Sequence, residues 1–193
     1  PAACAHAAAA TNASFVFCDA ASLPNFSARI VRCVVCWSEE AELPAGCVPW
    51  SQFVARAREV HELEVDSRMS QQRPGDCCAV VFTSGTTSMP KAAMLSHDSV
   101  TWVASTVVRV FSVDHRDRIV SFLPLSHVAA QLIDLHGPLT CGLCVTFAEP
   151  DALRGSLVAT LREVRPTVFF GVPRVYEKMQ ERILAFGRRR AAH

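Results

Sequence analysis

A continuous apolar run followed at once by a hydroxyl-rich loop is the feature that most constrains the fold of this chain. Residues 77–82 read Cys-Cys-Ala-Val-Val-Phe, and residues 83–91 read Thr-Ser-Gly-Thr-Thr-Ser-Met-Pro-Lys. An apolar run of this length, bounded by turn residues, is typical of a buried strand. Open α/β sheets commonly bind ligands at the carboxyl ends of their strands. We therefore expect a ligand-binding loop directly after this strand.

The composition of the loop indicates phosphate as its ligand. Backbone N–H groups and short hydroxyls in a tight loop donate to several phosphate oxygens at once, and a lysine adds a compact positive charge. A Ser/Thr/Gly-rich surface turn is the alternative for such a tract. An ordinary P-loop is not expected, because Pro90 precedes the lysine and Ala92 follows it. The predicted phosphate-binding residues are Thr83, Ser84, Gly85, Thr86, Thr87, Ser88 and Lys91.

Strand-like and helical segments alternate along the chain, which predicts an α/β domain with a largely parallel sheet flanked by helices. The expected strands are 14–18, 30–37, 77–82, 119–123, 143–147 and 167–170. The expected helices are 51–62, 97–112, 126–139, 151–164 and 173–186. Ser51 is the expected N-cap of the first helix, and the polar stretch 64–75 is an expected loop.

Charge and cysteine content argue against several classes of function. Nineteen basic and eighteen acidic residues leave a formal charge of +1, so nucleic acid is not an expected partner. No apolar run approaches the roughly 18 residues of a membrane-spanning helix. The nine cysteines lack the spacing of a secreted disulfide framework or a zinc ribbon, so we expect reduced thiols and no metal site. Residues 188–193, which include three arginines, are expected to form a flexible tail, with attraction to a membrane surface as the alternative.

The loop and three later segments resemble one enzyme superfamily. Residues 82–92 resemble the signature of the adenylate-forming enzymes, [YF]-T-S-G-T-T-G-x-P-K-G, with Ser88 and Ala92 in place of two glycines. Segments 121–131, 147–153 and 165–178 are similar to those of the bubblegum-type long-chain acyl-CoA synthetases. If position 88 needs a left-handed backbone, serine costs about 1 kcal/mol there.

The resemblance implies that residues 1–193 are a fragment of the N-terminal domain of an adenylate-forming enzyme, here a long-chain fatty acid–CoA ligase. In such an acid-thiol ligase a fatty carboxylate attacks the α-phosphate of ATP, pyrophosphate leaves with Mg²⁺, and the CoA thiol then displaces AMP. Lys91 and His127 are the implied catalytic residues. The implied acyl- and CoA-binding residues are His127, Gly171, Val172 and Pro173, although a turn such as 171–173 can also be a simple tight connection.

The same resemblance limits what the chain can do by itself. After Arg174 nothing resembles the adenine-binding, ribose-binding or C-terminal lysine motifs of the family, so the isolated chain is not expected to complete catalysis. The opening without methionine suggests a piece of a longer protein. Two alternatives are open: a non-catalytic or degenerate paralogue that binds nucleotide weakly, and an acyl-adenylating enzyme for another carboxylic acid. The expected location is cytoplasmic, including peripheral association with the endoplasmic reticulum membrane.

Overall fold

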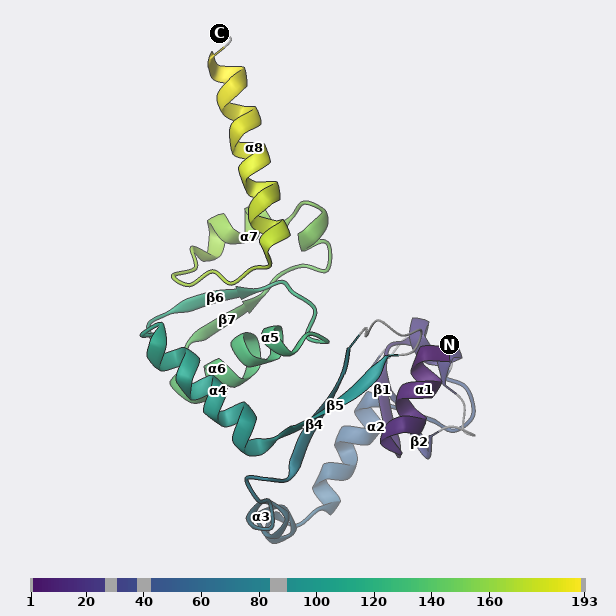
Figure 1. The fold of residues 1–193 in the computed structure, drawn as a ribbon. Helices are drawn as coiled ribbons and strands as arrows, with labels where there is room; N and C mark the ends of the chain where they lie inside the picture. Colours follow the sequence, from purple (N-terminus) through teal and green to yellow (C-terminus); the bar gives the residue numbers. More distant parts are fainter. Residues whose placement is uncertain (1, 27–30, 38–42, 84–89, 192–193) are drawn as a thin grey trace. The chain divides into compact units, whose positions relative to one another are not determined.

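The computed structural model describes residues 2–26, 31–37, 43–83 and 90–191 (Figure 1). The chain divides into two compact units, residues 1–98 and residues 99–193, each with its own strands and helices. Among the described residues, the strands form three small sheets, of which two are parallel and one is antiparallel. This mixed arrangement confirms the predicted α/β class with mostly parallel pairing.

The first unit begins with a parallel sheet in the order β1-β2-β3. Its strands are β1 (Phe15–Cys18), β2 (Cys33–Cys36) and β3 (Cys47–Pro49). Val35 and Cys36 are fully buried, because β-branched and small apolar side chains pack on both faces of this central strand. Helix α1 (Ala2–Thr11) contributes Ala8 to the same core. The first two predicted strands are therefore confirmed.

A helical region follows the first sheet, and it contains two differences from the sequence prediction. Helix α2 (Trp50–Ala55) continues into the 3-10 turn η2 (Arg56–Glu59), but its N-cap is Pro49 and not Ser51. Helix α3 (Glu62–Ser70) occupies most of the stretch predicted as a loop. This short helix has no buried residue, so apolar periodicity could not reveal it. Local interactions stabilise it instead: His61 caps its N-terminus, and Glu64 pairs with Arg68 one turn later.

Strand β4 (Cys77–Thr83) forms at the predicted position, but its surroundings differ from the prediction. It pairs antiparallel with β5 (Lys91–Ser96), a strand that the sequence analysis did not anticipate. We expected a buried strand, yet Val81 is its only buried residue. A two-stranded ribbon leaves one or both faces uncovered, and in the described part of the chain the other residues of β4 are at least partly exposed. The prediction of burial was therefore wrong, while that of a strand was right.

The second unit is built around the parallel pair β6 (Arg118–Ser121) and β7 (Cys144–Phe147). Helix α4 (His97–Val110) leads into this unit and buries Val100 and Ala104. Between the two strands runs a continuous helical stretch formed by α5 (Val128–Gln131), the π-helical segment η3 (Leu132–His136) and α6 (Gly137–Cys141). The predicted helix over 126–139 is thus confirmed, with a π-helical interruption that the sequence did not indicate.

The remaining helices complete the second unit. They are the 3-10 turn η4 (Ala152–Arg154), α7 (Leu157–Val164) and α8 (Pro173–Ala191). Val120, Ala152 and Leu157 form a core with Phe122, Val175 and Met179 packed against it. No helix within the described part of the chain is both long and apolar enough to cross a membrane.

The predicted strand 167–170 does not form. The N–H groups of Thr167 and Val168 both donate to the carbonyl oxygen of Arg118, at 2.9 and 3.2 Å. These two bonds reach one carbonyl oxygen of β6, so the segment lies beside the start of β6 without building a ladder. The segment therefore serves as an irregular connection between α7 and α8.

Candidate functional site

The base of the predicted phosphate loop is formed by the ends of β4 and β5. Thr83 and Lys91 are directly paired across the two strands, and the Thr83 hydroxyl lies 3.5 Å from the Lys91 carbonyl oxygen. The Lys91 side chain is exposed. Ser84, Gly85, Thr86, Thr87 and Ser88 lie outside the described residues, so their predicted contacts with phosphate stay predictions. The loop thus begins at a residue with a hydroxyl, Thr83, and ends at the paired residue Lys91, whose charge is carried on a long flexible side chain.

His6 is a loop-base residue that the sequence analysis missed. It lies in α1, and its Nε2 atom is 3.1 Å from the carbonyl oxygen of Pro90, the residue before Lys91. Its ring also meets Phe82 edge-on, with centroids 6.4 Å apart. With Nε2 protonated, the ring donates a hydrogen bond that fixes the backbone on the β5 side of the loop. A separation of 84 residues carries no local sequence signal for such a contact.

The backbone at Ala92 bears on one of the two departures from the superfamily signature. Ala92 lies in the extended strand β5 opposite Phe82, and it is not among the described non-glycine residues with positive φ. Glycine is required only where φ is positive or another group must approach closely. Alanine therefore introduces no left-handed strain at this position. Position 88, the other departure, lies outside the described residues.

His127 stands at the end of the loop that follows β6. It is the N-cap residue of α5, with extended backbone angles of φ −91° and ψ 128°, and its side chain is exposed. Its N–H donates to the Pro124 carbonyl oxygen at 3.1 Å, and its own carbonyl oxygen accepts from the Gln131 N–H at 3.1 Å. The backbone of His127 is therefore held on both sides. Its imidazole is free to meet a ligand, as a catalytic or binding role requires.

The predicted turn Gly171-Val172-Pro173 is packed by aromatic rings next to the same loop. Phe122, the first residue after β6, stacks on Phe169 at a centroid distance of 5.4 Å. Tyr176 meets Phe169 edge-on and donates its hydroxyl proton to the Phe169 carbonyl oxygen at 3.2 Å. A Cβ atom at Gly171 would meet these three rings at 3.4 to 3.7 Å. The structure thus joins two segments that the resemblance assigned to acyl and CoA binding.

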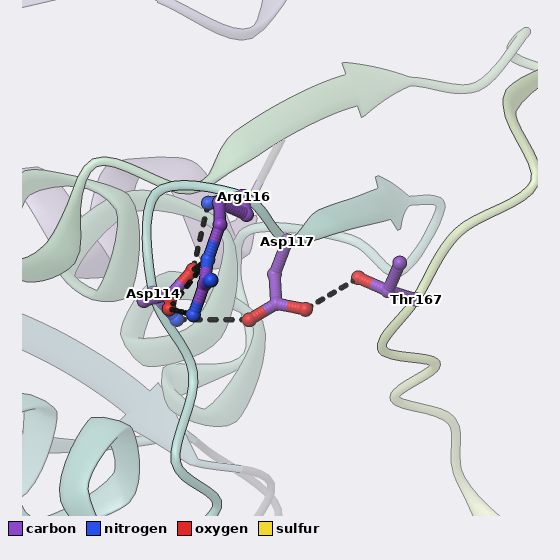
Figure 2. Close-up of polar contacts among 4 residues, drawn as sticks. All are labelled: Asp114, Arg116, Asp117 and Thr167. Atoms are coloured by element: carbon purple, nitrogen blue, oxygen red, sulfur yellow. Dashed lines mark hydrogen bonds and ion pairs between the residues drawn. The ribbon is translucent and has the colours of Figure 1, made fainter.

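A group of polar contacts anchors the start of the segment that leads to this turn (Figure 2). The Thr167 hydroxyl donates to Asp117 at 2.7 Å and accepts from the Arg118 N–H at 2.9 Å. Asp117 also accepts from the Asp114 N–H at 2.8 Å, and Arg116 is hydrogen-bonded and ion-paired to Asp114. The Arg116 contacts hold the pKa of Asp114 well below its ordinary value, at about 2. These contacts fix the turn before β6 and Thr167 in one place.

A groove of about 660 Å³ lies beside the Gly171–Pro173 turn within the second unit. Apolar side chains from two helices, α7 and α8, and from two connecting segments line it: Leu123, Leu157, Val158, Val172, Val175 and Met179. Four cationic side chains also line it, namely Arg154, Arg174, Lys178 and Arg182, together with the single acidic residue Glu181. The volume is that of a small-molecule site. An apolar surface with an excess of positive charge suits an anion that carries an apolar chain.

Solved structures show which fold this chain has. The anthranilate–CoA ligase AuaEII, solved with anthranoyl-AMP, aligns over 89% of this chain and 33% of its own, with a TM-score of 0.72 and 19% identity. The N-terminal domain of FACL13 from Mycobacterium tuberculosis aligns over 93% of this chain and 56% of its own, with a TM-score of 0.59 and 19% identity. The fold is that of an adenylate-forming enzyme domain.

The family follows from the sequence match. Residues 1–192 match the family described as AMP-binding enzyme, and the chain belongs to that family. The long-chain-fatty-acid–CoA ligase ACSBG2 of Xenopus laevis is 47% identical over 142 residues, which cover 72% of this chain and 19% of that protein. The human ligase ACSBG1 is 50% identical over 137 residues, which cover 68% of this chain and 19% of that protein. These bubblegum-type relatives confirm the resemblance, and the chain spans about a fifth of their length.

Proposed function

We propose that this chain supplies the phosphate loop and the acyl groove of a long-chain fatty acid–CoA ligase, an acid-thiol ligase that uses ATP, Mg²⁺ and CoA. The observation that carries the proposal is the groove beside Val172, with its apolar lining and four cations. A fatty acid presents these two features together, a long apolar chain and one carboxylate. The names of the relatives, long-chain-fatty-acid–CoA ligases, support the same substrate class.

In this proposal Lys91 and the loop act on the nucleotide. Fixed donors and a lysine stabilise the negative charge that moves onto the leaving pyrophosphate. Lys91 suits this task because its exposed, flexible side chain can follow the phosphate. Mg²⁺ would be held mainly by the nucleotide phosphates and its own waters and would neutralise phosphate charge, with the Thr83 hydroxyl as an oxygen donor at the loop base.

His127 and the Gly171–Pro173 turn act on the acyl group in this proposal. The aromatic cluster of Phe122, Phe169 and Tyr176 holds the turn beside the loop that carries His127. A groove lined by Leu123 and Val172 then lies next to both segments. Its apolar surface would exclude water from the acyl chain, while the exposed imidazole of His127 would face the passage used by the acyl group and CoA. We also propose that the protein is cytoplasmic and associates peripherally with the endoplasmic reticulum membrane. Cell fractionation tests this location.

The activity can be tested in a chimaera of the Xenopus laevis relative. The aligned 142-residue segment is replaced by the corresponding residues of this chain, and pyrophosphate release is measured with ATP and palmitate. Release that depends on palmitate supports the proposal. Release with a short or aromatic acid only would favour the alternative of another carboxylic acid. A folded chimaera that releases no pyrophosphate would favour the non-catalytic alternative. Residues 1–193 alone are expected to form no acyl-CoA.

The groove can be tested with residues 1–193 directly. Val158 lines the groove and is 41% exposed, so Val158→Glu places a negative charge there without opening the core. The expected result is a loss of palmitate binding by about tenfold or more in calorimetry, because a carboxylate repels the anionic head and disfavours the chain. Val54→Glu is the matched control, since Val54 is 47% exposed in α2 of the other unit. Equal loss in both variants would contradict the assignment of the groove.

A further inference from the structure

Ser121 and Asp134 are the two polar side chains buried within the described part of the chain. Each is 5% exposed, and the Ser121 hydroxyl donates to Asp134 Oδ2 at 2.7 Å. Ile119 and Val120 on the same strand and Ala130 on the same helical stretch are also buried. A polar group in such surroundings costs free energy unless it is hydrogen-bonded. Burial raises the pKa of Asp134, and the Ser121 hydrogen bond opposes this rise.

The positions of the two residues give their hydrogen bond a further effect. Ser121 is the last residue of β6, and Asp134 lies in the π-helical segment η3. Between them lie the loop 122–127, which ends at His127, and the first turn of the helical stretch. The bond therefore ties the strand before the loop to the helix after it. π-Helical segments are uncommon and occur frequently at functional sites.

Gln131 adds a second connection between the helix and the loop. Its Nε2 atom donates to the Leu125 carbonyl oxygen at 2.6 Å. Gln131 and Asp134 are three residues apart, so helical spacing places them on neighbouring positions of one face. The Gln131 side chain holds the middle of the loop, and the Asp134 side chain holds the end of β6, from which the loop begins. Leu125 and His127 are exposed, so apolar packing does little to fix the loop between these points.

We propose that Asp134 is a positioning residue, whose buried hydrogen bond with Ser121 fixes loop 122–127 and thereby the place of His127. The role of His127 in the reaction rests on the proposed function. The ordering of loop 122–127 does not rest on it, because that ordering follows from the hydrogen bonds alone. Asp134 touches no reacting atom and acts through the loop.

Amide hydrogen exchange on residues 1–193 tests the effect on loop order. Asp134→Ala and Ser121→Ala each remove the bond, and both are expected to speed exchange of the amides of residue 123 and residues 125–127 by about tenfold. Asp134→Asn keeps an oxygen acceptor for the Ser121 hydroxyl and is expected to keep exchange slow. Thr140→Val is the control, because it removes a hydrogen bond of the same helical stretch, from Thr140 to the His136 carbonyl oxygen. It is expected to leave loop 122–127 unchanged.

Two results of the hydrogen-exchange experiment would overturn the proposal. Unchanged exchange at 123–127 in Ser121→Ala, or a uniform increase over all amides of the unit, would show that the bond contributes only to global stability. If Asp134→Ala does not fold, Ser121→Ala and Asp134→Asn decide the question, since both preserve the shape of the core.

A kinetic readout in the chimaera separates positioning from general stability. Ser121→Ala is expected to lower the rate of CoA-thioester formation about tenfold while the KM for ATP stays unchanged, because the loop carries His127 and not the phosphate contacts. Asp134→Asn is expected to restore most of the rate. A change in the KM for ATP alone would contradict the role. A chimaera without any activity would refute the proposed function, while the exchange result would still stand.

Discussion

The two loops that carry Lys91 and His127 are supported in different ways. The Lys91 loop begins and ends on the ribbon β4–β5, where Met94 is 74% exposed and Val81 is the buried residue of β4. The His127 loop follows β6, where Ile119 and Val120 are 1% and 2% exposed, and a buried polar pair connects strand to helix. The base of the Lys91 loop is held by strand pairing and one histidine contact. The His127 loop is held by hydrogen bonds from a buried strand and helix.

This difference matches what each residue is proposed to do. A lysine that accompanies a leaving phosphate benefits from a flexible stem and an exposed position. A residue that lines a passage for an acyl group must stay at one place, because small displacements reduce catalysis steeply. The comparison therefore predicts that substitutions near Lys91 change chemistry more than stability, and that substitutions under the His127 loop change both.

Truncation of Ile119 gives the largest expected effect. Ile119→Ala removes buried volume beneath the His127 loop, and it should lower the free energy of unfolding by about 2 to 5 kcal/mol. Val80→Ala on β4 is the matched variant, because Val80 is 36% exposed, and it should change stability by about 0.5 kcal/mol. Urea denaturation measures both. Similar losses would show that the two strands are equally buried in solution.

Removal of the Lys91 charge is expected to affect the reaction and not the fold. Lys91→Ala in the chimaera should slow adenylation by about 10²-fold, the usual effect of losing one preorganised electrostatic contact. Palmitate binding should not change. Arg109→Ala removes another exposed positive charge, in α4, and serves as the control. Normal pyrophosphate release by Lys91→Ala would mean that this lysine is an ordinary surface charge.

His6 tests how far one contact fixes the Lys91 loop. His6→Ala removes the hydrogen bond to the Pro90 carbonyl oxygen and should destabilise the first unit by about 1 kcal/mol. Amides of β5 should then exchange faster. His61→Ala removes another histidine contact of the same unit, the cap of α3, and should leave β5 unchanged. If β5 exchanges at the same rate in both variants and in the parent chain, His6 does not order the loop base.

The smallest expected effect is the difference in titration between two carboxyls, the partly exposed Asp114 and the buried Asp134. The pKa of Asp114 is lowered to about 2, so its stabilising contribution is present above its ordinary pKa of 3.8 and is lost as the pH falls through about 2. The pKa of Asp134 is raised, so its contribution is full below the ordinary pKa and is lost as the pH rises through the raised value. The two carboxyls therefore give stability opposite slopes with pH.

Carboxyl NMR titration of residues 1–193 measures both groups. Arg116→Gln should move the pKa of Asp114 upward, toward its ordinary value, because it removes the charged hydrogen-bond donor. Arg109→Gln is the control and should leave it in place. An Asp134 that titrates at or below its ordinary pKa would show that water reaches it, and the contrast between the two carboxyls would disappear.

Most of the architecture could be predicted from the sequence because it depends on local patterns. Apolar runs located β1, β2, β4, β6 and β7, and the adenylate-forming signature located Thr83 and Lys91 at a strand end. The failures also have local reasons. Helix α3 has no apolar face, and the segment 167–170 has strand-like residues but only one carbonyl partner in β6. Neither the apolar periodicity of a segment nor its strand propensity indicates which other segment it will pair with.

The sequence by itself determined the class of the domain and the position of the strand that precedes the predicted phosphate loop, because these depend on residue type and spacing along one stretch of chain. Only the tertiary structure decided the long-range contacts. His6 meets Pro90 across 84 residues, and Phe122 stacks on Phe169. Ser121 finds Asp134 only because the helical stretch folds back on its strand. Such contacts depend on packing and burial, which bring together residues that no local pattern connects.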